Sequence, residues 1–453
     1  MATIDTILNE GIRHLDGQDF QQAIASFNKA LDSQPEHPDA NHLLGCAACK
    51  LGKPEIGIKF ILRAIELNAS IPAFYESAGH YFHKMHRFQE AVTHFRKALK
   101  FDPNNNANLA SLGSCLLDGG NWKQASEYFQ KSIDINPSNA SAHYGLGFAL
   151  LCAGDFQRGF EEYEWRWKTD KYGQFQRHAE FLFWDGTTQG GKRILIHTEQ
   201  GYGDTFLFSR YLKEVKAKGM HVILETRKEL MPLFQDDVSV DELFPMDAPL
   251  PAFDCQCSLL SIPRVLNSTI DELPGTMPYI APRLKSNIEL PVGKKIGLVW
   301  AGSVNNQNDT VRSVSLDHYL PLIDCGTDCS FISLQKSPKS KDIKELNLSS
   351  RVLDLDDQLN DFLDTASVIN ELDLLITVDT GVAHLAGAMN KPVWVIVPPD
   401  PDWRWLIKKN HLPLMMQGWD TSPWYPGSRI YRRSAIQEID GIIALMCEDL
   451  IRL

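Results

Sequence analysis

The chain has 453 residues, of which 43% are hydrophobic and 23% are charged. These values are typical of folded proteins, and the length predicts two or three domains rather than one core. The formal net charge of -12 opposes a long phosphate-binding surface, so we expect no nucleic-acid partner. No apolar run approaches the roughly 18 residues that a bilayer span needs, and the N-terminus lacks a signal-peptide pattern. We expect no membrane span and a cytoplasmic location.

Nine cysteines without a secretory signal predict reduced thiols rather than a disulfide framework. Three close pairs occur, Cys46/Cys49, Cys255/Cys257 and Cys325/Cys329. The first pair lies in a helical repeat, where free cysteine packs as a small apolar residue. The other two pairs have no companion Cys or His at zinc-ribbon spacing. We predict no metal site.

Small residues recur with a period of 34 residues, at Gly11, Gly45, Gly79, Gly113 and Gly147. Another small residue follows each glycine by 12 positions and a bulky one comes four positions later, as Ala23 and Phe27 do in the first unit. Three units end in proline, at Pro35, Pro103 and Pro137, where a helix should stop. The pattern predicts antiparallel helix pairs, because small residues let two helices approach and the bulky residue fills the gap to the next pair.

This pattern resembles the tetratricopeptide repeat, with four units from about Ile4 to Asn136 and a decayed fifth unit, so we predict a repeat domain over residues 1–170. A stack of such units commonly holds an extended segment of another protein on its concave face. A spacer or a dimerisation surface is the alternative. The candidates to bond a peptide backbone are Asn41, Asn106, Asn108 and Asn139. A turn or cap role is favoured for Asn106 and Asn139, which flank helix starts.

Residues 171–190 read as a bridge, and beyond residue 191 short β-rich runs alternate with helical stretches. This alternation predicts α/β layers with parallel sheets. The expected strands are Arg193–His197, His221–Glu225, Lys295–Trp300, Ser330–Leu334, Leu374–Val378 and Val393–Val397. They form two series, over 191–285 and 292–430, and Pro282 and Pro291 bracket the linker between them.

Each series contains a strand, a glycine turn and a helix start, where backbone amides meet an anion or a polar substrate. In the first series the turn runs from Thr198 to Thr205, and Asp204 has helix capping as its ordinary role. In the second, Asp379, Thr380 and Gly381 follow a buried strand. The amides of Thr380 and Gly381 are expected to face a pyrophosphate, with Asp379 and His384 addressing polar atoms of the ligand. The alternative for His384 is a helix residue paired with a carbonyl.

Four motifs together resemble those of bacterial repeat-containing glycosyltransferases. They are Glu199–Thr205, Gly297–Ser303, Thr377–His384, and Pro401–Trp405 with Ser422–Pro426. Those proteins belong with the heptosyltransferase-like glycosyltransferase family nine and are similar in architecture to the protein O-GlcNAc transferases. The resemblance implies the GT-B fold, a pair of Rossmann-like lobes, which follows the α-helical repeat superhelix in the chain.

By this resemblance the lobe over 292–430 holds a nucleotide-sugar, and the lobe over 191–285 faces the acceptor. The implied donor-binding residues are Ser303, Arg312, Asp379, Thr380, Gly381 and His384. The implied loop near the acceptor comprises Glu199, Gln200, Gly201 and Gly203. Such enzymes are typically metal-independent, with Arg312 helping to stabilise the leaving diphosphate, and a surface ion pair is the alternative for this arginine. Asp204 matches the general base of an inverting reaction, a role that can coexist with capping.

Some features depart from the family pattern or invite another interpretation. Tyr202 stands where an aliphatic residue is usual, and residues 408–418 look like an expansion of unknown role. Core packing is favoured over sugar stacking for Trp403, Trp405, Trp424 and Tyr425. Asp354 and Asp356 could be mistaken for a metal-binding pair, but helix-dipole and solvation roles suffice.

The end of the chain, residues 431–453, predicts a final helix packed across the lobes. The pattern Ser434–Gln437 indicates a capping box, and Ile436, Ile439, Ile443, Met446 and Leu450 give an apolar face.

The leading hypothesis is an inverting glycosyltransferase that modifies a protein held by the repeats. One alternative is an inactive scaffold whose transferase-like module binds a nucleotide without turnover. Another is transfer to a lipopolysaccharide-type glycan, in which case the repeats would be dispensable for activity. The sequence names neither the nucleotide, the sugar, the acceptor nor the oligomeric state.

Overall fold

A computed structural model describes residues 3–188, 190–281, 288–304, 309–398, 402–405, 420–433 and 438–452. The chain divides into two compact units. The repeat unit comprises Met1–Ala153 with Glu162–Lys171, and the second unit comprises Gly154–Glu161 with Tyr172–Leu453.

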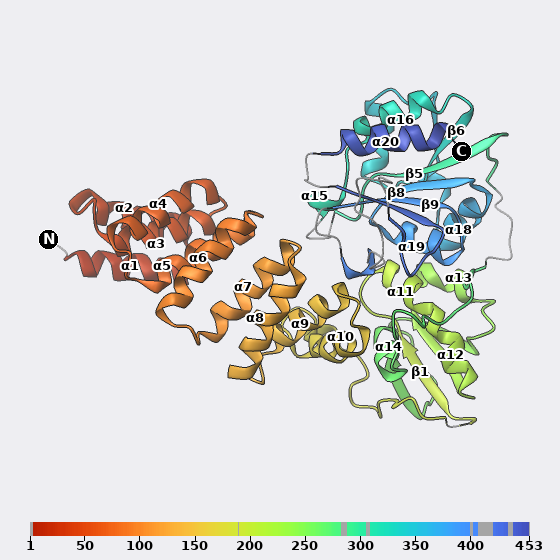
Figure 1. Cartoon of the computed structure of the whole chain (residues 1–453), viewed down its shortest axis with the longest axis horizontal. Coiled ribbons are helices and arrows are strands. Elements are labelled where there is room, and N and C mark those ends of the chain that lie inside the picture. The colour runs from red at the N-terminus through yellow and green to blue at the C-terminus, as the bar shows by residue number, and fades with distance from the viewer. Residues whose placement is uncertain are drawn as a thin grey trace. The chain divides into compact units, whose positions relative to one another are not determined.

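The repeat unit is a superhelix of consecutive helix pairs, coloured red to orange in Figure 1. Its helices are α1 (Ile4–Asp16), α2 (Phe20–Ser33), α3 (Pro38–Lys50), α4 (Pro54–Leu67), α5 (Pro72–Lys84), α6 (Phe88–Phe101), α7 (Asn106–Asp118), α8 (Trp122–Ile135) and α9 (Ala140–Cys152). The helix α10 (Phe156–Tyr163) and a 3-10 turn, Glu164–Lys168, follow. The repeat prediction is confirmed.

The predicted pairing of small and bulky residues explains this packing. A Cβ built on Gly113 would lie 2.8 Å from Cε1 of Phe129, and one on Gly79 would lie 2.8 Å from Cδ2 of Phe95. Both rings are buried. Because a Cβ essentially never comes this close to another carbon, glycine is what allows the two helices of a pair to approach. The helices α2, α6 and α8 each stop two residues before their proline, as predicted.

The second unit contains two parallel sheets, which form the cores of two lobes. The first lobe (residues 191–281) has the strand order β3-β2-β1-β4, and the second lobe (residues 288–452) has the order β10-β9-β8-β5-β6-β7. The strands of the first lobe are β1 (Arg193–His197), β2 (His221–Thr226), β3 (Glu242–Pro245) and β4 (Cys255–Ser258). Those of the second are β5 (Lys294–Val299), β6 (Cys329–Ser333), β7 (Val352–Asp354), β8 (Leu374–Val378), β9 (Val393–Val397) and β10 (Ser428–Arg432).

Helices connect these strands. In the first lobe they are α11 (Tyr202–Phe208), α12 (Leu212–Ala217), α13 (Met231–Phe234) and α14 (Ile262–Val265). In the second lobe they are α15 (Asp309–Arg312), α16 (Leu320–Cys325), α17 (Asp342–Glu345), α18 (Phe362–Glu371), α19 (Gly381–Ala388) and α20 (Asp440–Ile451). In each sheet the strand order reverses beside the first strand of the lobe. The reversal lies between β1 and β4 in the first sheet and between β5 and β8 in the second.

The segment predicted as a bridge lies with the second unit. Phe183 pairs in parallel with Gln256 on the edge strand β4, and Arg177 lies 2.7 Å from the Glu225 carboxylate. His197, at the end of β1, is buried beside this ion pair. Burial, together with the charge of Arg177, lowers its pKa to about 3, so the ring stays neutral.

The final helix, α20, packs on the second lobe and not across both lobes, which corrects the prediction. Ile443, Met446 and Leu450 are buried in one core with residues of β5 and β8, and Tyr431 donates a 2.7 Å hydrogen bond to Asp449. Together with α16, this helix covers one face of the parallel sheet. The expected capping box, Ser434–Gln437, lies outside the described residues.

Candidate functional site

The predicted donor-binding residues gather at the carboxyl edge of the six-stranded sheet. Gly302 and Ser303 follow β5, and Asp379 and Thr380 follow β8, its direct neighbour. The sheet reverses its order between these two strands. In open α/β sheets this switch point leaves a crevice outside the strand ends, which is the usual place for a ligand.

Asp379 is held by an indole that the sequence did not assign to the site. Nε1 of Trp405 donates to Oδ1 of Asp379 over 2.6 Å. Burial and the nearby Asp402 raise the pKa of Asp379, while Trp405, Arg312 and Arg404 act in the opposite direction. The side chain of Thr380, the residue before α19, lies 3.1 Å from the hydroxyl of Thr377. The turn before α19 is therefore fixed from both sides.

His384 is a neutral, oriented imidazole. Only 4% of the residue is exposed, and burial, with the positive charge of Arg404, lowers its pKa to about 3. Its Nδ1 lies 3.0 Å from the hydroxyl of Tyr425, and its ring stacks on Trp405 with a centroid distance of 4.6 Å. Its ring partner is thus a tyrosine hydroxyl, not the backbone carbonyl of the alternative interpretation.

Arg312 lies beside the loop that follows β5, the other strand of the switch point. Its guanidinium packs against Gly302, where a built Cβ would lie 2.3 Å from Nη2, and its Nε lies 3.4 Å from Oδ1 of Asp309. The ion pair of the alternative interpretation is therefore present, but both side chains are largely buried. Ser303 is exposed on the same loop.

The loop of the first lobe is organised around its own switch point. Ser258, at the end of β4, donates a short hydrogen bond to Glu199, which follows β1. The backbone carbonyl of Gln200 accepts a 2.5 Å hydrogen bond from Arg227. Asp204, on the first turn of α11, accepts a hydrogen bond from the amide of Gly201 over 2.8 Å. The capping role of Asp204 is confirmed.

The two lobes meet through α11 and α19, which lie side by side in Figure 1. A Cβ built on Gly203 would lie 2.7 Å from Cδ2 of His384 and 3.5 Å from Cα of Gly381. A Cβ built on Gly381 would in turn lie 3.4 Å from the amide nitrogen of Gly203. Glycine on both helices thus brings Asp204 next to the predicted donor residues.

Arg404 belongs to the same cluster, although its residue type alone did not predict a place in the site. Its Nη2 lies 2.6 Å from Oδ1 of Asp204, across the boundary between the lobes. Arg404 and Trp405 belong to the motif Pro401–Trp405, and Tyr425 belongs to the motif Ser422–Pro426, so those motifs were the available clue. The favoured interpretation of the aromatic residues is confirmed, since Trp403, Trp405, Trp424 and Tyr425 are each at most 1% exposed.

Two departures from the expected pattern have different outcomes. The ring of Tyr202 contacts Phe362 with a centroid distance of 4.7 Å, and the guanidinium of Arg227 lies 5.0 Å from its centre. Tyr202 thus packs between the lobes. Residues 408–418 lie outside the described residues.

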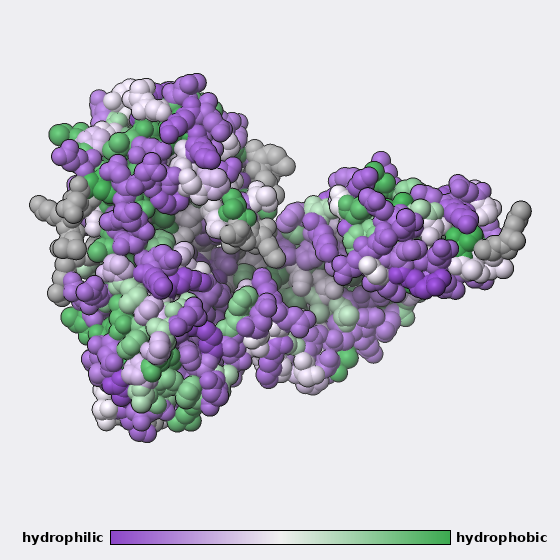
Figure 2. Space-filling model, turned by 180° about the vertical axis from the view of Figure 1, so that it is seen from behind, coloured by the Kyte–Doolittle hydropathy of each residue, from purple (hydrophilic) through white to green (hydrophobic). Residues whose placement is uncertain are grey.

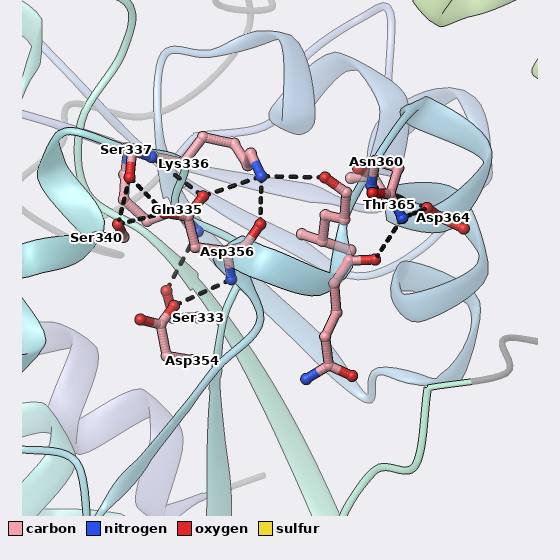
Figure 3. Close-up of polar contacts among 12 residues, drawn as sticks. Ser333, Gln335, Lys336, Ser337, Ser340, Asp354, Asp356, Asn360, Asp364 and Thr365 are labelled. Carbon is pink, nitrogen blue, oxygen red and sulfur yellow. Dashed lines mark hydrogen bonds and ion pairs between the residues drawn. The ribbon is translucent and has the colours of Figure 1, made fainter.

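The acidic pair at the end of β7, Asp354 and Asp356, is occupied by protein donors, as Figure 3 shows. Asp356 accepts from the hydroxyls of Ser337 and Ser340 over 2.5 and 2.6 Å and pairs with Lys336 at 2.9 Å. Burial acts to raise the pKa of Asp356, but these hydrogen bonds outweigh it and leave the pKa below its ordinary value. Burial raises the pKa of its neighbour Asp354. These contacts explain the pair without a metal ion.

The four asparagines predicted as candidates for peptide binding are also engaged within the protein. Asn139 caps α9 and donates to Asn106 over 2.8 Å. Asn108 donates to Glu76 over 2.7 Å, and Asn41 donates to the carbonyls of Pro35 and His37.

Two features are absent from the described part of the chain. No group of three or more His, Cys, Asp or Glu side chains is placed to hold a metal ion there. Within the same residues, no helix has both the length and the apolar character to span a bilayer.

Family models match three segments of the chain. Residues 8–70 match a tetratricopeptide repeat model, and residues 84–165 match the model of the anaphase-promoting complex, cyclosome, subunit 3. Residues 358–397 match glycosyltransferase family 9 (heptosyltransferase). This last match runs through α18, β8, the Asp379–Gly381 turn, α19 and β9.

Protein FlbA of Caulobacter vibrioides is 24% identical over 302 residues, which are 60% of this chain and 48% of FlbA. Small glutamine-rich tetratricopeptide repeat-containing protein 2 of Mycosarcoma maydis is 30% identical over 105 residues, 23% of this chain and 30% of that protein. The chain thus spans about half, or less, of the curated relatives that it matches.

Solved repeat proteins match part of the chain. A crystal structure of MamA covers 37% of this chain and 97% of its own, with 19% identity and a TM-score of 0.34. YrrB, described as a TPR protein with an unusual peptide-binding site, covers 39% of this chain and 92% of its own, with 16% identity and a TM-score of 0.35. The family models indicate that the chain combines tetratricopeptide repeats with a glycosyltransferase-like module.

Proposed function

We propose that the protein is an inverting, metal-independent glycosyltransferase with a GT-B pair of lobes. The second lobe binds a nucleotide-sugar at the switch point between β5 and β8, and the first lobe presents the acceptor. The observation that carries this proposal is the contact of Gly203 with His384, because it brings the helix that carries Asp204 against the predicted donor-binding helix, where Asp204 pairs with Arg404. The family match over residues 358–397 supports the assignment of the donor lobe.

In the proposed reaction, an acceptor hydroxyl loses its proton to Asp204 and its oxygen attacks the anomeric carbon of the sugar. The bond from that carbon to the phosphate oxygen breaks, and the electron pair leaves with the nucleoside diphosphate. Arg312 and the amides of Thr380 and Gly381 stabilise the charge on the leaving group. The neutral His384 supplies an oriented hydrogen-bonding group rather than a charge. In-line attack inverts the configuration at the sugar.

A thermal-shift panel with UDP, GDP, ADP and CDP, with and without EDTA, tests the donor site. We expect one nucleotide to raise the unfolding temperature equally with and without chelator. Asp379→Ala should abolish the shift, whereas Asp357→Ala, an exposed residue of the same lobe, should keep it. No shift with any nucleotide on folded protein would contradict the proposal.

A second assay distinguishes the enzyme from an inactive scaffold. The matching nucleotide-sugar is incubated with the protein, and released diphosphate and free sugar are measured. We expect slow hydrolysis that Asp204→Asn reduces by about 100-fold or more, the usual contribution of a general base. Binding without any release of sugar would favour the scaffold.

The acceptor is proposed to be a polypeptide, held by the repeats. The repeat unit has an open cavity of about 450 Å³ between the starts of α7 and α9 and the turn at Lys168, lined by residues that include Ala107, Ser141 and Asp170. Figure 2 shows hydrophilic residues over much of the face of this unit that is in view. These features suit a polar, extended segment better than a lipid.

Blocking this cavity tests the acceptor class. Ala107→Arg and Ser141→Arg should lower transfer to proteins of a cell extract, while hydrolysis of the nucleotide-sugar stays unchanged. Gln130→Arg, on the exposed side of α8, is the matched control. If transfer goes to a glycan and the two cavity variants match wild type, the lipopolysaccharide-type alternative is favoured.

A further inference from the structure

The segment Trp403–Trp405 carries three large side chains with three different contacts. Trp403 packs edge-on to Phe160, with ring centres 5.8 Å apart. Trp405 stacks on His384 and donates to Asp379. Both indoles are fully buried, so they fix the backbone on either side of Arg404.

Arg404 is shared among acidic and polar groups of both lobes. Its Nη2 lies 2.6 Å from Oδ1 of Asp204 and 3.4 Å from Oε1 of Gln200. Its Nη1 lies 2.8 Å from Oδ1 of Asp402. The side chains of Arg404 and Asp204 are only 10% and 12% exposed. A close, largely desolvated pair of this kind interacts more strongly than a surface pair.

The pairing conflicts with a proton-accepting role for Asp204. One carboxylate oxygen of Asp204 accepts from the amide of Gly201, and the other faces the guanidinium. Oδ1 accepts no hydrogen bond from the described residues, but it is buried against the guanidinium, so an acceptor hydroxyl would have to compete with the ion pair to Arg404 for this oxygen.

The same guanidinium acts electrostatically on the donor side. Burial raises the pKa of Asp379 and lowers that of His384, and the positive charge of Arg404 opposes the first shift and adds to the second. A guanidinium presents a planar fork of donors that matches phosphate oxygens as well as carboxylates.

We propose, on the basis of the proposed function, that Arg404 is a diphosphate-binding residue that exchanges Asp204 for the diphosphate of the donor. The exchange frees Oδ1 of Asp204 to receive the proton of the acceptor hydroxyl. Donor binding thus activates the base, and the donor binds before the acceptor. No atom is transferred in this step, since one ion pair replaces another.

A double-mutant cycle on nucleotide binding tests the exchange. Isothermal titration uses whichever of UDP, GDP, ADP and CDP stabilises wild type most. Asp204→Asn should tighten binding by about three- to tenfold, because it removes the carboxylate that competes for Arg404. Arg404→Gln should weaken binding by about tenfold or more. In the double variant, Asp204→Asn should give no gain over Arg404→Gln alone.

Controls separate this effect from loss of structure. Arg404→Lys keeps the charge and should bind more tightly than Arg404→Gln but more weakly than wild type. Arg452→Gln, at a 71% exposed side chain, should bind as wild type does. Thermal unfolding without nucleotide shows whether each variant is folded, and if Asp204→Asn is not, the comparison of Arg404→Lys with Arg404→Gln decides.

Equal affinity of Asp204→Asn and wild type, or of Arg404→Gln and Arg404→Lys, would overturn the exchange while leaving the donor site intact. An equal gain from Asp204→Asn in the presence and absence of Arg404 would also overturn it. If wild type binds none of the nucleotides, the proposed function itself fails.

Discussion

Replacing Gly203 by alanine tests whether the close approach of α11 and α19 matters for the donor. The added Cβ would lie 2.7 Å from Cδ2 of His384. Carbon atoms in contact rest about 3.5–4.0 Å apart, so the ring or a helix must move by roughly 1 Å. Overpacking of this kind costs about 1–3 kcal/mol. If that cost falls on nucleotide binding, the affinity drops by about 5- to 150-fold.

The assay is titration of the nucleoside diphosphate that stabilises wild type, combined with thermal unfolding of the free protein. Gly441→Ala is the matched control, because a Cβ built there meets no atom within 4 Å. If the cost falls on folding instead, the unfolding temperature drops and the affinity does not. Wild-type affinity together with a wild-type unfolding temperature would refute the packing argument.

Tyr425→Phe removes the hydroxyl at Nδ1 of His384 and should weaken nucleotide binding by about fivefold, the typical worth of one hydrogen bond; unchanged affinity in titration would count against an oriented imidazole. His197 and His384 have pKa values lowered to about 3, whereas unfolded histidine titrates near 6.5. Below about pH 6.5 the unfolded chain therefore binds more protons than the folded chain. The free energy of unfolding decreases as the pH is lowered, by up to about 1.4 kcal/mol per pH unit for each of the two histidines. His197→Gln should flatten this loss in urea unfolding between about pH 6.5 and 5, and equal slopes would contradict it. Gly113→Ala should destabilise the repeat unit by about 1–3 kcal/mol through its clash with Phe129, and an unchanged denaturation midpoint would argue against that packing.

The strands that the sequence predicted are those with continuous aliphatic runs. Leu374–Val378 and Val393–Val397 appear with the predicted bounds as β8 and β9, because a strand buried on both faces reads as an apolar run. The strands β3, β4 and β10 were not predicted. β3 ends in proline, β4 reads Cys-Gln-Cys-Ser, and β10 contains two arginines, so each lacks the β-branched or aromatic run that marks a strand.

The candidate site was predictable where it is local in sequence. The turn at Asp379–Gly381 follows a strand and precedes a helix, and such a turn can be located from a single chain. The partners of these residues could not be predicted in the same way. Arg404 pairs with a residue 200 positions earlier in the chain, and a contact at that separation depends on the packing of two lobes rather than on any local period.

The position of Arg404 also explains why a charged residue stands between two buried tryptophans. Trp403 and Trp405 are held by aromatic contacts and by the hydrogen bond to Asp379, so the backbone between them has little freedom. Arg404 has a long side chain, and its ion pair with Asp204 is a contact between two side chains that can be exchanged without moving that backbone. An arginine on a loosely held loop would lose more conformational entropy on binding a diphosphate. The indoles thus limit that entropy cost, and the guanidinium retains the freedom to change partners.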